Sequence, residues 1–197
     1  MTYEDKVIEY IAQPENLPVA LEVADAVQNL RESIHRQFWP FFSEQYQEKL
    51  FDSEYTEQWK YFPFPITHLK KEYEISILSP IRPKEQDSSA LLFIFGQGSR
   101  ENHYRLLMGV AWNGVIGDPN HPALNNLKRQ LISQQLTTSW EWWPGWKYLD
   151  YSLGSGEFML KFYHTPKEVV TELAEEFWQL FLELRPTIES INQELAK

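Results

Sequence analysis

The sequence predicts an α+β fold in which a central, mostly antiparallel sheet is flanked by a long N-terminal and a long C-terminal helix. Three observations lead to this expectation. Apolar residues recur every three or four positions over 20–41 and again over 169–195, which is the period of a helix. Between these stretches lie short apolar runs separated by turns, as in antiparallel sheets. We expect the two helical stripes to sandwich a ring-filled sheet in a single domain over 1–197, with its weakest join near 52–70.

The N-terminal helices are delimited by prolines and a capping residue. A short helix is predicted over 4–12. Asn16 is suited to cap a second helix that has Pro18 in its first turn. Because proline lacks the backbone N–H of a helix interior, Pro40 is expected to kink or end this second helix after Trp39.

Two further helices follow in the second half of the chain. The stretch Asp118–Pro122 precedes a helix whose apolar side begins at Leu124. The last helix has the clearest start, because Thr165 offers a hydroxyl cap, Pro166 takes the first helical position and Glu168 completes a capping box. Pro186 is expected to interrupt it.

The strands are predicted from short apolar runs bounded by turn residues. Glu72–Leu78 reads as a strand that ends at the proline-rich stretch after it. Leu91–Phe95 and Tyr104–Trp112 flank a glycine-bearing turn and predict an antiparallel hairpin. Pro144-Gly145 marks a turn within a tryptophan-rich segment, and Phe158–Tyr163 reads as the last strand.

Charge and composition bound the classes of function. The net charge of −10 is uneven: residues 1–60 carry 12 acidic and 5 basic side chains, whereas 61–147 carry 7 and 9. Acidic surfaces repel nucleic-acid phosphates and attract basic partners. The chain has no cysteine, no signal-peptide pattern at its start and no apolar run long enough to span a membrane, so we expect a cytoplasmic protein without membrane contact.

The sequence offers no recognisable catalytic or metal-binding pattern. Without cysteine, a thiol nucleophile is excluded, and no serine occupies a G-x-S-x-G elbow. The five histidines form no i, i+4 zinc pair, although His121 follows Asp118 by three residues. The glycines of 96–98 lead into a strand instead of the helix that a phosphate loop requires. We therefore predict no catalytic residue, no metal and no cofactor.

The tryptophan-rich segment 140–148 is the most unusual feature of the sequence. Its rings could stack on a base, a sugar or a proline-rich peptide, or could pack across a hairpin as core. Basic residues nearby could add charge to such a surface. The predicted binding residues are Trp140, Trp142, Trp143, Trp146, Arg100, Arg105 and Lys147.

One family resemblance rests on element order and ring placement over residues 70–197. The stretch Tyr104–Trp112, the helix at Leu124–Leu131, the tryptophan-rich strands and Glu176–Trp178 together resemble the C-terminal, non-catalytic part of bacterial PD-(D/E)XK nuclease-superfamily proteins. The resemblance implies a setting in defence or restriction. The catalytic signature of that family is missing, because the predicted strands carry no Asp-x-Lys or Glu-x-Lys triplet. No catalytic residue is carried over.

Three functional hypotheses follow. The first is a non-catalytic binding protein whose acidic ends meet a basic protein, as an inhibitor or immunity-type factor would. The second is an accessory nucleic-acid-binding module, in which Arg100, Arg105, Lys128, Arg129 and Lys147 line a groove floored by Trp142 and Trp146. The third is an enzyme acting on a small ligand in a ring-lined cleft through Glu72, Glu74 or His103. The sequence predicts no oligomeric state.

Overall fold

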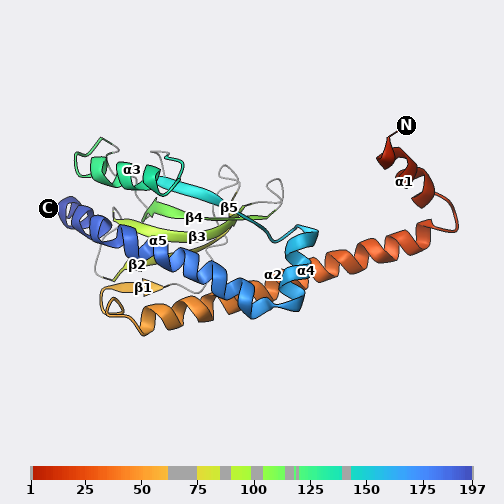
Figure 1. Cartoon of the computed structure of the whole chain (residues 1–197), viewed down its shortest axis with the longest axis horizontal. Coiled ribbons are helices and arrows are strands. Elements are labelled where there is room, and N and C mark those ends of the chain that lie inside the picture. Colours follow the sequence, from red (N-terminus) through yellow and green to blue (C-terminus); the bar gives the residue numbers. More distant parts are fainter. Residues whose placement is uncertain are drawn as a thin grey trace.

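The chain folds around a five-stranded antiparallel sheet whose strands follow one another in chain order (Figure 1). The computed structural model describes residues 2–61, 75–84, 90–98, 104–113, 118, 120–138 and 143–196. The strands are β1 (Trp59–Tyr61), β2 (Ile75–Pro83), β3 (Leu91–Gly98), β4 (Arg105–Trp112) and β5 (Gly145–Ser152). Every neighbouring pair is antiparallel, and the predicted hairpin of Leu91–Phe95 with Tyr104–Trp112 is confirmed as β3–β4.

Two long helices and three shorter ones accompany the sheet. The helices are α1 (Tyr3–Ile11), α2 (Leu17–Phe51), α3 (Leu124–Ser133), α4 (Gly156–His164) and α5 (Pro166–Leu195). Figure 1 shows α2 and α5 as the longest elements, with α1 and the first half of α2 extending away from the sheet. The α+β class and the long helix at each end are confirmed.

Both long helices pack on the same face of the sheet. Phe95 of β3 contacts Phe42 of α2 and Phe177 of α5, with ring centroids 4.0 and 5.4 Å away. The expectation that the helices sandwich the sheet is therefore wrong. The residues that alternate with Phe95 face the other side, where Ile94 and Leu107 belong to a separate, smaller buried cluster. A strand buried on both faces reads as an unbroken apolar run and does not reveal which face takes the helices.

The long helices do not end at their prolines, so the expected helix end after Trp39 and the expected interruption at Pro186 are wrong. α2 continues through Pro40 and α5 through Pro186. Each proline is exposed, so its ring points to solvent, and buried side chains lie within two residues on both sides, among them Phe42 after Pro40 and Ile188 after Pro186. Burial of those neighbours offsets the one helical hydrogen bond that proline removes.

The segment predicted as the last strand is helix α4. Phe158, Met159 and Phe162 are its buried residues, and their spacing of one and four positions fits one face of a helix. Ser155 caps the helix, because its Oγ accepts a hydrogen bond from the Phe158 N–H at 3.1 Å. The expected capping box before α5 is also wrong, since Thr165 Oγ1 instead donates to the carbonyl of Lys161 at 3.2 Å.

The strand predicted over Glu72–Leu78 corresponds to β2, which continues past Leu78 to Pro83. Its described part runs through Pro80 to Pro83, while Glu72 and Glu74 lie outside the described residues. In the described residues, β1 pairs with 81–83 of β2, and Pro80 is paired with Ile94 of β3.

A buried asparagine connects the C-terminal helix to the sheet. Asn192 of α5 is 2% exposed; its Oδ1 accepts from the Leu91 N–H at 2.7 Å and its Nδ2 donates to the Leu91 carbonyl at 3.0 Å. The side chain thus supplies both hydrogen bonds that a neighbouring strand would supply. Replacing it with leucine leaves two backbone groups without partners.

We expect Asn192→Leu to lower the free energy of unfolding by about 2 kcal/mol, because a buried polar group without a partner costs about 1–3 kcal/mol. Urea unfolding measures the change. Gln193→Leu is the matched control, since Gln193 is exposed and should change stability by no more than about 0.5 kcal/mol. Equal losses in both variants would contradict the capping role of Asn192.

Candidate functional site

The N-terminal arm, defined here as residues 2–33, is the part of the described chain with the least tertiary packing. It comprises α1 and the first half of α2, and it extends away from the sheet (Figure 1). No described side chain in the arm is buried, and the first buried residue of the chain is Ile34. Most helical stability in proteins comes from packing an apolar face. The arm therefore has helical surface that no other described part of the protein covers.

The arm nevertheless has an apolar face. Val23 and Leu30 of α2 are 56% and 38% exposed, and Ile8 of α1 is 65% exposed. The full set of large exposed hydrophobic residues in the arm is Tyr3, Val7, Ile8, Tyr10, Ile11, Leu17, Val19, Leu21, Val23 and Leu30. These are ten of the fourteen such residues among the described part of the chain, so exposed apolar surface is concentrated in the arm.

The opposite face of the arm helix is acidic and polar. Glu22, Asp25, Asn29 and Glu32 recur at steps of three and four and therefore share one side of α2. The arm as a whole carries seven carboxylates and two basic residues, a net charge of −5, which is half of the net charge of the chain. The first half of α2 thus has an apolar side with Val23 and Leu30 and an acidic, polar side, on which Leu21 is the exposed apolar exception.

The root of the arm is firmly held by the aromatic core. Phe38 of α2 packs edge-on against Phe158 of α4 at 5.9 Å and lies 6.0 Å from Phe162. The apolar stripe of α2 that contains Phe38 runs back through Ile34 and Val27 into the arm, where it forms the apolar face. The core therefore fixes the direction in which the arm leaves the body and which way its apolar face points.

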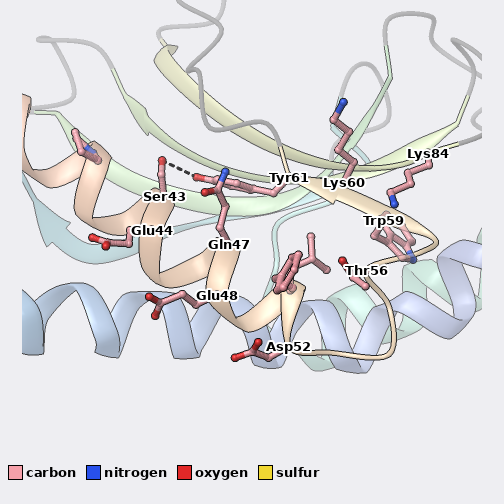
Figure 2. Close-up of a pocket in the computed structure, with 13 residues that line it drawn as sticks. Ser43, Glu44, Gln47, Glu48, Asp52, Thr56, Trp59, Lys60, Tyr61 and Lys84 are labelled. Carbon is pink, nitrogen blue, oxygen red and sulfur yellow. Dashed lines mark hydrogen bonds between the residues drawn. The ribbon is translucent and has the colours of Figure 1, made fainter.

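A second concave surface lies between the second half of α2 and strand β1 (Figure 2). This cleft has a volume of about 940 Å³ and its apolar floor includes Trp59. Glu44 and Glu48 line it from α2, and Figure 2 shows Ser43 hydrogen-bonded to Tyr61, with 3.0 Å between the two oxygens. Its described lining residues include no imidazole; their charged members are three carboxylates, Glu44, Glu48 and Asp52, and two lysines, Lys60 and Lys84. Among these described residues the cleft offers an open surface of mixed charge and no recognisable catalytic group.

The predicted tryptophan–arginine groove is only partly within the described chain. Trp140, Trp142 and Arg100 lie outside the described residues, and so does His103. Trp143 is partly buried and packs against the smaller cluster of Leu92, Ile94, Leu107 and Ala111. At this position the ring serves as packing for the sheet face opposite the helices.

The described residues of that groove divide between the two faces of β5. Trp146 meets the ring of Tyr148 edge-on, with 5.0 Å between centroids. The Arg105 guanidinium lies over the same Tyr148 ring at 5.0 Å, and its Nε donates to the Leu149 carbonyl at 2.9 Å. Lys147 lies on the helix side of the sheet and pairs with Glu176 of α5 at 3.1 Å. The structure brings Arg105 and Trp146 to one tyrosine and places Lys147 elsewhere; ligand binding by these residues stays a prediction.

The described part of the chain contains no group of three or more His, Asp or Glu side chains placed to hold a metal ion. Among the same residues, no helix combines the length and apolar character that crossing a membrane requires. Asp118 and His121, the one pair that the sequence suggested for a metal, cap local turns instead: Asp118 Oδ1 accepts from the Asn120 N–H, and His121 Nδ1 accepts from the Ala123 N–H.

No family model, no curated protein and no solved structure matches this chain. The resemblance of 70–197 to PD-(D/E)XK nuclease-superfamily proteins therefore stays a prediction.

Sequence reasoning expected the acidic ends of the chain to meet a basic protein, but it did not identify the exposed apolar face of the arm. The pattern of 20–41 predicted a buried stripe, and only its second half is buried. One signal distinguishes the two halves: the stripe uses small aliphatic residues up to Val27 and changes to rings from Phe38 onward. Rings bury far more area each, so the ring-bearing half is the one that can anchor to a core.

Proposed function

We propose that this chain is a non-catalytic binding protein whose N-terminal arm docks into an apolar groove, rimmed by lysine and arginine, on a protein partner. The single observation that carries the proposal is the concentration of exposed apolar side chains on an arm without a buried residue. An amphipathic helix laid into a groove is a recurrent mode of protein recognition. The absence of cysteine fits action in a reducing compartment such as the cytoplasm.

The charge of the arm favours a basic partner. Its net charge of −5 would meet lysine and arginine side chains at the edge of the groove, which speeds association and fixes orientation. A second copy of this chain would bring another arm of the same charge, and like charges placed together oppose binding. Anionic membranes and nucleic acids carry the same sign as the arm and are disfavoured for the same reason.

The alternative function, in which a groove lined by basic residues binds nucleic acid, has weaker support. Arg105 already contacts the Leu149 carbonyl and the Tyr148 ring, and Lys147 is paired with Glu176. Cations with protein partners are less available to phosphates.

The test uses the full chain and a defined basic probe, a helical peptide of leucine and lysine with one apolar face. We expect fluorescence anisotropy to show binding that weakens as salt is raised. We also expect Val23→Ser/Val27→Ser to weaken binding about tenfold or more, because burying a valine contributes about 1.5 kcal/mol or more. Hydrogen exchange should slow in 2–33 when the peptide is bound.

Gln28→Ser/Asn29→Ser is the matched control, since it places the same two serines on the polar face without changing charge. It should bind like the unaltered chain. Equal binding by both double variants would overturn the arm as the docking site. Association of the chain with itself that needs the arm and tightens with salt would overturn the basic partner, and so would binding of a leucine–glutamate peptide equal to that of the basic one.

A further inference from the structure

A small pocket lies where the arm joins the body, at the opposite side of α2 from most of the apolar face. It is open to solvent and has a volume of about 400 Å³. It is lined by Gln28, Arg31, Glu32, His35 and Arg36 of α2 and by Tyr104, the residue just before β4. The α2 residues occupy successive turns, so their side chains border one hollow.

Two arginines in this pocket form no ion pair with any described residue, in a chain whose net charge is −10. Neither Arg31 nor Arg36 forms an ion pair in the described chain, whereas Lys49, Lys161 and Arg185 each pair with a glutamate. The Nε of Arg31 is buried and makes no hydrogen bond. This donor is therefore available to an acceptor that enters the pocket.

The remaining wall of the pocket is aromatic and held in place. The His35 ring packs edge-on against the Tyr104 ring, with centroids 4.9 Å apart. Tyr104 takes a φ of 56°, in the left-handed region that residues other than glycine rarely adopt, so the surrounding structure fixes it there. Burial lowers the pKa of His35 below its ordinary value, which favours the neutral ring with one N–H donor.

We propose that this pocket binds the phosphate group of a small phosphorylated molecule, held by Arg31 and Arg36 with His35 as a further donor. Two guanidinium groups balance the two charges of a phosphate monoester, and arginine matches the geometry of phosphate oxygens. Among the described lining residues, Glu32 is the one carboxylate, and its Oε1 accepts a hydrogen bond from Gln28 Nε2 at 3.2 Å. The rings of His35 and Tyr104 form a wall against which an organic portion can pack.

This site goes beyond the proposed docking function and does not depend on it. The pocket residues Gln28 and Glu32 lie on the polar side of α2, while Val23 and Val27 lie on the apolar side. A ligand in the pocket and a partner on the arm would therefore contact different faces of one helix.

The test follows the His35 ring by NMR while inorganic phosphate or AMP is added to the full chain, with the signal assigned through His35→Gln. We expect saturable shifts of that signal with both ligands. Arg31→Gln and Arg36→Gln should each weaken binding about tenfold, as loss of a charge-assisted hydrogen bond does. Arg129→Gln, which removes an exposed charge on α3, is the matched control and should leave the affinity unchanged.

Acetate at the same ionic strength separates phosphate from carboxylate recognition. Acetate shifts equal to those of phosphate would overturn the phosphate assignment. No saturable shift, or equal weakening by Arg129→Gln and Arg31→Gln, would overturn the site itself. Circular dichroism of each variant confirms that the fold is retained, and the leucine–lysine peptide test of the arm is scored separately, so failure of either proposal leaves the other intact.

Discussion

Replacing Phe42 with alanine is expected to lower the free energy of unfolding by about 3–5 kcal/mol, the usual cost of removing a buried phenylalanine ring. Phe42 is fully buried and stacks on Phe95 of β3, with 4.0 Å between centroids and 18° between ring planes. It also lies 6.1 Å from Tyr46 and 6.4 Å from Phe177 of α5. The substitution opens a cavity where α2, α5 and the sheet meet. The neighbouring rings are themselves closely packed, so they can fill the cavity only in part and the loss of stability is large.

Urea unfolding followed by tryptophan fluorescence measures this loss. Phe51→Ala is the matched control, because Phe51 belongs to the same helix but is 77% exposed. Its truncation should change stability by no more than about 0.5 kcal/mol. A small loss at Phe42, or a loss at Phe51 of the same size, would contradict the placement of the core between α2 and α5.

The class of fold was predictable because its signals are local. A hairpin needs two apolar runs and a turn, and β3–β4 provides them within about two dozen residues. The two long helices show the 3.6-residue period over many turns, so single prolines weigh little against the sum of buried side chains. Pro40 is overridden in this way, since Phe38 and Phe42 on either side of it are fully buried.

The burial of a stripe was less predictable than its existence. Periodicity indicates that one face is apolar and says nothing of what covers that face. Val23 and Phe38 belong to the same stripe, yet Val23 is 56% exposed and Phe38 is fully buried. The difference arises because the sheet, α4 and α5 extend only as far as the second half of α2.

Helix α4 was misjudged for a different reason. The run from Phe158 to Tyr163 is short and almost wholly apolar, and such a run fits a strand and a helix equally well. The deciding signal was Ser155, which precedes the run and caps it. Because Ser155 precedes Gly156, the pair was interpreted as a turn, although serine is also a favoured helix cap.

The candidate sites show the same limit of local reasoning. Arg31, His35 and Arg36 are close in sequence, but Tyr104 comes from the start of β4, and nothing local indicates that it joins them. Strand alternation, by contrast, was available from the start: Trp146 and Lys147 are adjacent and must face opposite sides of β5. A groove on one face of β5 therefore holds only one of these two side chains, and ligand binding by either stays a prediction.

Replacing Gly109 with alanine is expected to lower the free energy of unfolding by about 3 kcal/mol, the upper part of the usual range for overpacking. Gly109 of β4 is paired with Trp146 of β5. A Cβ placed on Gly109 would lie 2.7 Å from the Trp146 Cα, inside van der Waals contact, and would also overlap the Gly145 carbonyl oxygen. Because these atoms are backbone, no rotamer change relieves the overlap, and β5 itself must shift away from β4.

Gly156→Ala tests whether the cost at Gly109 comes from this overlap or from the loss of a glycine as such. A Cβ on Gly156, at the start of α4, meets no atom within 4 Å. Alanine there should be neutral or stabilise the fold by about 0.4–1 kcal/mol, since it restricts the unfolded chain. The near-ultraviolet circular dichroism should also change in Gly109→Ala alone, because a displaced β5 carries the Trp146 and Tyr148 rings away from β4, where the Arg105 guanidinium now lies 5.0 Å from the Tyr148 ring. If both alanine variants had a lower free energy of unfolding than the unaltered chain, or both a higher one, the strands would not be as close at Gly109 as this geometry requires.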